Sequence, residues 1–260
     1  MQLNAIPAFS DNYLWTLVDG DRAVVVDPGD AAPVARFLDE RRLALEAILI
    51  THHHPDHIGG LGALLEPRPV PVYGPAAEAA TIGRLSTALA DGDRVEVLGR
   101  RFEVIAVPGH TLGHIAYFSA GAPPILLCGD TLFSAGCGRL FEGTPQQMHA
   151  SLSRLAALPA ETQVYCTHEY TLANLAFAQA VEPANADIAA QLARVRELRA
   201  RDTPSLPTTL AIERRINPFL RTGEPTVRSA AAAWAGVPLT DDVATFAALR
   251  RWKDGFRPPR

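Results

Sequence analysis

Hydrophobic residues follow two different patterns along the chain. Up to about residue 170, short apolar runs such as 47–50 and 125–129 are separated by Gly, Pro and Asp, which is typical of buried β-strands joined by tight turns. The same part contains three stretches with helical periodicity, at 31–41, 57–65 and 145–157. The pattern therefore predicts a mixed α/β unit in this part of the chain.

Beyond residue 170 the strand pattern nearly disappears. Ala- and Leu-rich stretches predict four helices, at 169–181, 185–201, 226–235 and 241–252. Proline-containing segments at 203–207 and 217–218 interrupt the series, because proline cannot continue a helix. A second, helical part is therefore expected to follow the mixed part.

The most unusual polar stretch lies between a predicted strand and a predicted helix start. It carries His52, His54, Asp56 and His57 within six residues. Imidazoles and carboxylates are ligands of zinc, iron and manganese, and a chain that turns from a strand into a helix directs alternate side chains at one point. The stretch predicts a metal site with enough donors for two neighbouring ions.

Three further candidate ligands, His110, Asp130 and His168, each follow the end of an apolar run. Side chains at the same ends of neighbouring strands meet at one edge of a sheet, where ligands of α/β proteins bind. We therefore expect these three to join the first cluster in a two-metal site. His149 lies in a predicted amphipathic helix and is expected to have no catalytic role.

His53 and His114 are intermediate cases, which we expect to orient the loops or to face away from the metals. Asp27 follows the apolar run 24–26, and two interpretations stay open for it. It either orients a ligand as a second-layer partner or simply forms a turn.

The arrangement His-x-His-x-Asp-His, followed by His110, Asp130 and His168, resembles the metallo-β-lactamase superfamily. That first motif is shared by lactamases, lactonases, nucleases and persulfide dioxygenases. Within the superfamily, several short sequence motifs are similar to those of the glyoxalase II, or hydroxyacylglutathione hydrolase, family. The similarity extends essentially over the whole chain. These motifs are Asp11-Asn12-Tyr13, the run from Gly136 to Thr144, the run from Thr167 to Thr171, Asn217-Pro218-Phe219 and the run from Arg250 to Asp254.

The resemblance and the two-part pattern together imply an α/β fold, a four-layer αββα metallo-β-lactamase sandwich with a C-terminal α-helical domain. The expected division is a catalytic domain at 1–168 and a substrate-binding helical domain at 169–260. The resemblance also implies a ligand set: His52, His54 and His110 hold one ion, Asp56, His57 and His168 hold the other, and Asp130 bridges them. Asp130, Asp56 and His57 would carry the catalysis.

The activity that the resemblance implies is hydrolysis of S-(2-hydroxyacyl)glutathione. For S-D-lactoylglutathione the products are glutathione and D-lactate, the second step of methylglyoxal detoxification. Arg139, Arg250 and Lys253 match positions that bind the glutathione carboxylates in the family. Lys253 is the only lysine among 24 basic residues, and a compact, flexible ammonium suits a carboxylate partner.

Three further residues belong to the expected substrate site. Tyr170 is expected to keep a hydroxyl for the tripeptide, and His168 lies beside it. Phe141 stands where some members have a tyrosine, so one hydrogen bond is expected to be absent and glutathione binding to be weaker without being lost. Arg139 replaces a lysine of some members and keeps the charge.

Composition narrows the class of protein. A chain of 260 residues with 48% apolar residues can bury a substantial core. The apolar runs fall short of the roughly 20 residues that span a bilayer, and no signal-peptide pattern is visible, so we expect a cytoplasmic protein without a membrane partner. The net charge of -4 argues against nucleic acid, and the three cysteines lack the spacing of a disulfide framework.

The expected cofactors are two divalent ions, zinc first, although iron and manganese accept the same donors. The expected partner is a small glutathione thioester, and the enzyme is expected to be a monomer. Two alternatives stay open. A mononuclear iron persulfide dioxygenase would leave Asp56 and His57 unused and typically lacks the helical domain. A non-catalytic metal-binding module would have a closed and usually Cys-rich zinc site.

Overall fold

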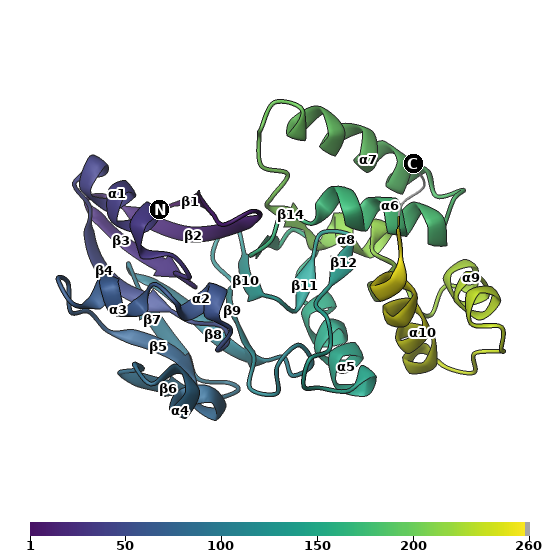
Figure 1. Ribbon diagram of the computed structural model, residues 1–260, viewed down its shortest axis with the longest axis horizontal. Helices are drawn as coiled ribbons and strands as arrows, with labels where there is room; N and C mark the ends of the chain where they lie inside the picture. The colour runs from purple at the N-terminus through teal and green to yellow at the C-terminus, as the bar shows by residue number, and fades with distance from the viewer. Residues whose placement is uncertain (258–260) are drawn as a thin grey trace.

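Two six-stranded sheets form the centre of the protein in the computed structural model, which describes residues 1–257 (Figure 1). The first sheet has the order β1 (Gln2–Ala8), β2 (Asn12–Asp19), β3 (Arg22–Val26), β4 (Ala44–Leu49), β5 (Val72–Pro75) and β6 (Thr87–Leu89). The second has the order β14 (Thr208–Thr209), β13 (Gln163–Cys166), β10 (Ile125–Gly129), β9 (Ile115–Ser119), β8 (Arg100–Ala106) and β7 (Arg94–Val97).

Side-chain alternation on β2 shows how the first sheet is covered on both faces. Tyr13, Trp15 and Leu17 point into a core shared with the second sheet. Leu14, between them in sequence, points to the opposite face and packs in a separate core with helix residues such as Leu38. Successive side chains of a strand lie on opposite faces, so a strand that is apolar at nearly every position is buried on both.

Helices complete the two outer layers of this sandwich. The helices α1 (Ala31–Arg41) and α3 (Leu61–Leu65) cover the first sheet, and α5 (Pro145–Ala156) covers the second. The short elements α2 (Pro55–Ile58), η1 (Ala76–Glu78) and α4 (Ala79–Ile82) connect strands of the first sheet, and β11 (Leu132–Phe133) pairs with β12 (Gly136–Cys137) beside the second. The expected αββα order is confirmed.

The rest of the described chain is helical except for β14. It contains α6 (Thr171–Val181), α7 (Ala186–Arg199), α8 (Leu210–Ile216), η2 (Pro218–Leu220), α9 (Pro225–Ala235) and α10 (Asp242–Gly255). A separate apolar core joins α6, α7 and α8, and these helices lie to the right of the sandwich in Figure 1. The expected C-terminal helical region is therefore confirmed.

Two local expectations were wrong. The helix expected at 57–65 is divided into α2 and α3, because Gly60 packs so closely that a Cβ there would lie 2.4 Å from the carbonyl oxygen of Pro28. The strand β14 and the helix α8 were not predicted, and β14 adds an antiparallel edge to β13. No helix within residues 1–257 is long and apolar enough to cross a membrane.

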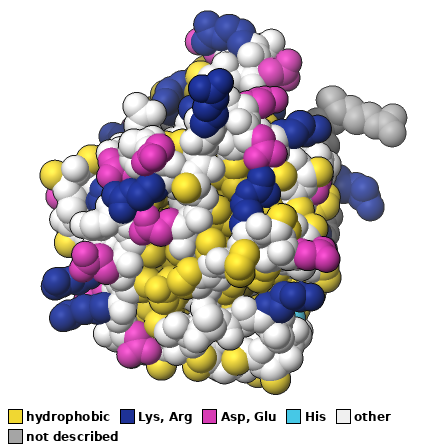
Figure 2. Space-filling model, turned by 90° about the vertical axis from the view of Figure 1, so that its left-hand side faces the viewer, with side chains coloured by type: hydrophobic (Ala, Val, Ile, Leu, Met, Phe, Trp, Pro, Cys, Tyr) yellow, Lys and Arg dark blue, Asp and Glu magenta, His cyan; other side chains and the backbone are white. Residues whose placement is uncertain are grey.

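The direction of the strands explains why distant residues meet. Strands β10 and β13 are parallel, and β8 has the same direction because both it and β10 pair antiparallel with β9. The chain therefore leaves β8, β10 and β13 at one edge of the second sheet, just before His110, Asp130 and His168. Figure 2 shows the side of the molecule that lies at the left in Figure 1, where acidic and basic side chains are interspersed around apolar ones.

Candidate metal centre and substrate groove

Seven side chains from four segments converge in two groups of three around Asp130. In the first group, the Nδ1 atom of His54 lies 3.0 Å from Nε2 of His52 and 3.0 Å from Nε2 of His110. In the second, Oδ2 of Asp56 lies 3.5 Å from Nε2 of both His57 and His168. Each group presents three ligand atoms within 4.8 Å of one another, which is close enough for one ion.

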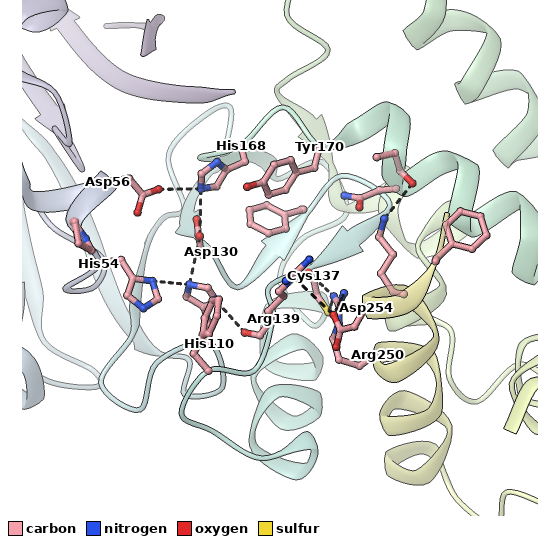
Figure 3. Close-up of a pocket in the computed structure, with 17 residues that line it drawn as sticks. His54, Asp56, His110, Asp130, Cys137, Arg139, His168, Tyr170, Arg250 and Asp254 are labelled. Atoms are coloured by element: carbon pink, nitrogen blue, oxygen red, sulfur yellow. Dashed lines mark hydrogen bonds and ion pairs between the residues drawn. The ribbon is translucent and has the colours of Figure 1, made fainter. Parts of the chain in front are cut away.

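Asp130 lies between the two groups and contacts both. Its Oδ2 is 3.4 Å from Nε2 of His110 and 3.3 Å from Nε2 of His168 (Figure 3). Its Oδ1 is 3.4 Å from Nε2 of His57. The structure thus brings together all seven residues that the sequence suggested as ligands. A carboxylate in this place can share its two oxygens between neighbouring ions.

A strained turn holds the first ligand segment. Asp27 has a φ of 49°, and its carboxylate accepts hydrogen bonds from the backbone N–H and the hydroxyl of Thr51, at 2.7 Å each. Its Oδ2 also lies 3.1 Å from Nδ1 of His57. Strain of this kind persists where the surroundings fix it, and here it directs the other ring nitrogen of His57 towards Asp130.

Asp130 approaches the first sheet because the residue before it is glycine. A Cβ at Gly129, which has a φ of +48°, would lie 2.4 Å from Oγ1 of Thr51 and 2.8 Å from the His114 ring. His114 is fully buried, and its Nε2 accepts a hydrogen bond of 3.1 Å from the backbone N–H of Asp130. His114 therefore helps to orient Asp130 through its backbone N–H and is not part of either group of three.

The turn between β1 and β2 and the first residue of β2 supply partners for the second group, and sequence reasoning missed the role of these partners. Asp11 lies 2.7 Å from Nδ1 of His168, and the side-chain amide of Asn12 donates a 3.0 Å hydrogen bond to Asp56. These contacts depend on an isolated bridge between Asn12 and His168. Nothing in the local sequence indicated this pairing, because the two segments meet only in the fold.

Burial and neighbouring charges shift the histidine pKa values of the two groups in opposite directions. For His57 and His168, burial lowers the pKa, but the charge of Asp130 outweighs it and the pKa is raised. Burial lowers the pKa of His52, His54 and His110, so these rings are neutral at pH 7, as metal ligands must be. Burial opposes a charge on Asp130, but His57 and His168 outweigh it and hold the pKa of this carboxyl well below its usual range. Asp130 is therefore ionised.

A groove of about 650 Å³ begins at this cluster and extends towards α10 (Figure 3). This size suits a ligand larger than a single amino acid. The metal end is formed by His54, Asp56, His110, Asp130 and His168, and the far end by Arg139, Asn174, Arg250, Lys253 and Asp254. Aromatic side chains, among them Phe141 and Tyr170, line the middle.

The basic residues at the far end differ in how free they are. The Arg139 side chain is 66% exposed, whereas Arg250 is buried and donates to Asp254 and to the carbonyl oxygen of Cys137. Lys253 donates to the carbonyl oxygen of Ala173 at 3.2 Å. Burial and the neighbouring Arg250 lower the pKa of Lys253 to about 8, so it is still mainly protonated at pH 7.

The two aromatic candidates contact the metal-site rings. Tyr170 stacks on His168 with ring centroids 4.7 Å apart, and Phe141 meets His54 and His110 edge to face at 5.4 and 5.2 Å. Both also line the groove. His149, by contrast, is not among the residues that line this groove, and its Nε2 lies 3.1 Å from the Thr222 hydroxyl.

Comparison with known proteins identifies a family for each of the two parts of the chain. A family model described as the metallo-beta-lactamase superfamily matches residues 10–168, and one described as hydroxyacylglutathione hydrolase C-terminus matches residues 169–256. A relative from Cupriavidus metallidurans, named hydroxyacylglutathione hydrolase, is 56% identical over 99% of this chain and 100% of its own length. A relative of the same name from Pseudomonas entomophila is 56% identical over 98% of this chain and 100% of its own length.

Solved structures share the fold at lower identity. The crystal structure of ETHE1 from Myxococcus xanthus matches with a TM-score of 0.65 and 25% identity, covering 100% of this chain and 93% of that one. The BLEG-1 B3 metallo-beta-lactamase matches with a TM-score of 0.62 and 25% identity, covering 84% of this chain and 99% of that one. Because relatives at 56% identity match over essentially their whole length, this chain belongs to the hydroxyacylglutathione hydrolase family within the metallo-beta-lactamase superfamily.

Proposed function

We propose that the chain hydrolyses the thioester bond of S-(2-hydroxyacyl)glutathiones, with S-D-lactoylglutathione as the main substrate, and uses two divalent metal ions to do so. The observation that carries the proposal is the meeting of two groups of three ligand atoms at Asp130, at one end of a groove with cationic residues at the other. The name shared by the 56% identical relatives supports the substrate class.

The donor atoms fit metal ions by their chemistry. Nε2 of His57 and Oδ1 of Asp130 are buried without a hydrogen-bond partner, which is costly unless another group satisfies them. Nδ1 of His54 lies 3.0 Å from Nε2 of both His52 and His110, and this convergence of three ring nitrogens suits a shared ion. We therefore assign His52, His54 and His110 to one ion, Asp56, His57 and His168 to the other, and Asp130 to both.

Two ions bound there would supply hydroxide at neutral pH and would polarise the thioester carbonyl. The chain's own residues fix the positions of these groups. Asp27 lies against the ring of His57, and Asp11 lies against the ring of His168. His114 accepts a hydrogen bond from the backbone of Asp130. Such outer partners keep ligands in one tautomer and one orientation.

The leaving group needs little help from the protein. A thiol has a pKa near 8.5, so a thiolate leaves more readily than an alkoxide and needs no general acid. Water adds across the acyl–sulfur bond, its oxygen joining the acyl carbon and a proton reaching the thiolate, which gives glutathione and a 2-hydroxy acid. This chemistry agrees with a centre whose acidic and basic side chains are assigned to the ions.

Glutathione recognition is assigned to the far half of the groove. The Arg139 guanidinium and the Lys253 ammonium face the groove and are proposed to bind the two carboxylates, with Tyr170 donating its hydroxyl. Arg250 is proposed to act on the same end, although Asp254 and the Cys137 carbonyl already occupy its donors. We further propose a functional division into 1–168 and 169–260, zinc as the metal and a monomeric enzyme.

The persulfide dioxygenase alternative is not favoured. One iron would leave Asp56 and His57 without a use, and the relatives that are 56% identical are named hydroxyacylglutathione hydrolase. The test is hydrolysis of S-D-lactoylglutathione by the purified protein, with bound metal quantified on the same sample. We expect thioester cleavage and two ions per chain. A single iron with oxygen consumption on glutathione persulfide, or a single zinc without hydrolysis, would overturn the proposal.

A further inference from the structure

His53 is the one histidine of the ligand segment that the metal assignment leaves without a role. Its ring lies between two carboxylates from separate parts of the chain. Nδ1 is 3.0 Å from Oε2 of Glu78, and Nε2 is 3.5 Å from Oε1 of Glu142. Glu78 ends η1 in the first half of the sandwich, and Glu142 lies in the loop between β12 and α5. The ring therefore connects the ligand segment to two other segments.

The same two carboxylates also hold the loop that carries His110. Oε1 of Glu78 accepts hydrogen bonds from the hydroxyl of Thr111 and, at 3.1 Å, from the backbone N–H of Gly113. Oε2 of Glu142 accepts from the backbone N–H of Leu112 at 2.8 Å. Three consecutive residues directly after His110 are thus fixed by the groups that hold His53.

Glu78 is the more constrained of the two carboxylates. It is 5% exposed, whereas the side chain of Glu142 is 36% exposed. A Cβ at Gly113 would lie 2.4 Å from Cγ of Glu78, so the glycine is required for this approach. A carboxylate is rarely buried so deeply unless several donors hold it. Here Oε1 accepts hydrogen bonds from the His110 loop, whereas Oε2 approaches Nδ1 of His53 at ion-pair distance without forming a hydrogen bond.

The first group of ligands spans the two sheets. His52 and His54 follow β4 of the first sheet, while His110 follows β8 of the second. The backbone N–H of Ile115 already donates a 3.0 Å hydrogen bond to the carbonyl oxygen of Thr51 between the two segments, and Glu78 adds a second connection. The Asp56, His57 and His168 group has different supports, namely Asn12, Asp27 and Asp11. Within the described residues, Glu78 forms no hydrogen bond or ion pair with any of these three supports.

We propose that Glu78 is a positioning residue of the metal centre, which fixes His52, His54 and His110 relative to one another because it contacts His53 and accepts hydrogen bonds from the Thr111 hydroxyl and the Gly113 backbone N–H. This inference rests on the proposed function, since it concerns one of the two ions assigned there. The inference predicts different effects at the two sites. Loss of Glu78 lowers the metal affinity of the three-histidine site and leaves that of the other site unchanged.

Metal affinity tests this without relying on activity. Metal-free protein is titrated with Zn²⁺ in competition with a chromophoric chelator, and the two binding steps are resolved. Glu78→Ala removes every contact, and Glu78→Gln keeps one oxygen for Thr111 and Gly113 but loses the carboxylate oxygen facing His53. We expect one step to weaken by about 10- to 100-fold in the alanine variant, less in the glutamine variant, and the other step to stay unchanged.

A matched control separates metal effects from a general loss of stability. Glu182→Gln removes another buried carboxylate, held by Arg221 and Thr226 in the helical region, and should leave both binding steps as in the wild type. A His54→Ala background assigns the affected step. Because that variant already lacks the three-histidine site, Glu78→Ala added to it should weaken the remaining step no further.

The outcomes distinguish this inference from the proposed function. If the wild type binds two ions and both Glu78 variants bind them with the same two affinities, the positioning role of Glu78 is wrong and the two-metal proposal survives. Equal weakening of both steps would also overturn it, because Glu78 would then support the fold and not one site. A wild type that binds fewer than two ions would overturn both.

Discussion

The metal end and the cationic end of the groove are built in different ways. At the metal end, His52 and His57 are fully buried and Asp130 is 6% exposed, and these side chains are held by partners from both sheets. At the far end, Arg250 is buried, but the Arg139 side chain is 66% exposed and lies in the loop between β12 and α5. The first arrangement fixes the geometry needed for chemistry, whereas the second leaves Arg139 free to adapt to a flexible tripeptide.

This difference predicts that substitutions at the two ends have different signatures. Changes at the metal end should lower metal content and slow every thioester alike. Changes at the cationic end should leave the metals in place and affect only substrates that carry glutathione. The following predictions test that separation, from the largest expected effect to the smallest.

Asp130→Ala should have the largest effect, because the carboxylate contacts ligands of both groups. We expect occupancy of at least one metal to fall and hydrolysis to decrease by more than about 100-fold, the upper end of what loss of an outer partner costs. Elemental analysis and initial rates measure both quantities, and circular dichroism checks the fold. Two ions per chain with a near-normal rate would exclude the bridging role.

Lys253→Ala should weaken glutathione thioesters without disturbing either metal. A charge-assisted contact contributes about 1 to 3 kcal/mol, so kcat/KM should fall by roughly five- to a hundredfold, mainly through KM if the contact is equally strong in ground and transition states. A small thioester without glutathione is the control. An equal slowing of that control would show that Lys253 supports structure or chemistry in general.

The pH dependence of glutathione recognition should reflect the lowered pKa of Lys253, about 8. Carboxylate binding needs the protonated ammonium, which is present below this pKa and is lost as the pH rises through it. We therefore expect kcat/KM for glutathione thioesters to decline above about pH 8. Lys253→Arg should remove this decline, because a guanidinium stays charged. The same decline in both proteins would place its origin elsewhere.

Tyr170→Phe should have the smallest effect of the series. The substitution keeps the ring that stacks on His168 and removes only the hydroxyl. Loss of a neutral hydrogen bond costs about 1 kcal/mol, so KM should rise about fivefold while the metal content stays the same. Steady-state kinetics with parallel metal analysis measure this. An unchanged KM would remove the Tyr170 hydroxyl from the substrate site.

Much of the fold could be predicted because local signals agreed with the global structure. The helix α1 (Ala31–Arg41) has the predicted bounds, and its start is marked by the N-cap Asp30, whose side chain accepts a hydrogen bond from Ala32 N–H. The strand β14 is only two residues long and exists because β13 offers it an edge. A strand of two residues is too short to show an alternating hydrophobic pattern in the sequence.

The candidate ligands could be found from the sequence because histidine and aspartate at strand ends are unusual residue types in unusual positions. Of their partners, the sequence indicated only Asp27 and His114 as candidates. Glu78, Asp11 and Asn12 are ordinary polar residues in the sequence, and they acquire a role only when segments far apart in the chain lie side by side. The exposed state of Arg139 and the internally paired state of Arg250 likewise depend on the fold.

The order of the proposed ligands along the chain has a consequence for biosynthesis. A ribosome adds about 5–20 residues per second, so the segment with His52 and His54 emerges seconds before His168. Until His168 is made, Asp11 and Asn12 lack the β-bridge that joins them to it, and the Asp56 and His57 group lacks its third member. The nascent chain can therefore complete only the three-histidine site. Loading of the second ion would then wait for His168, which makes a partly metallated chain an expected stage of maturation.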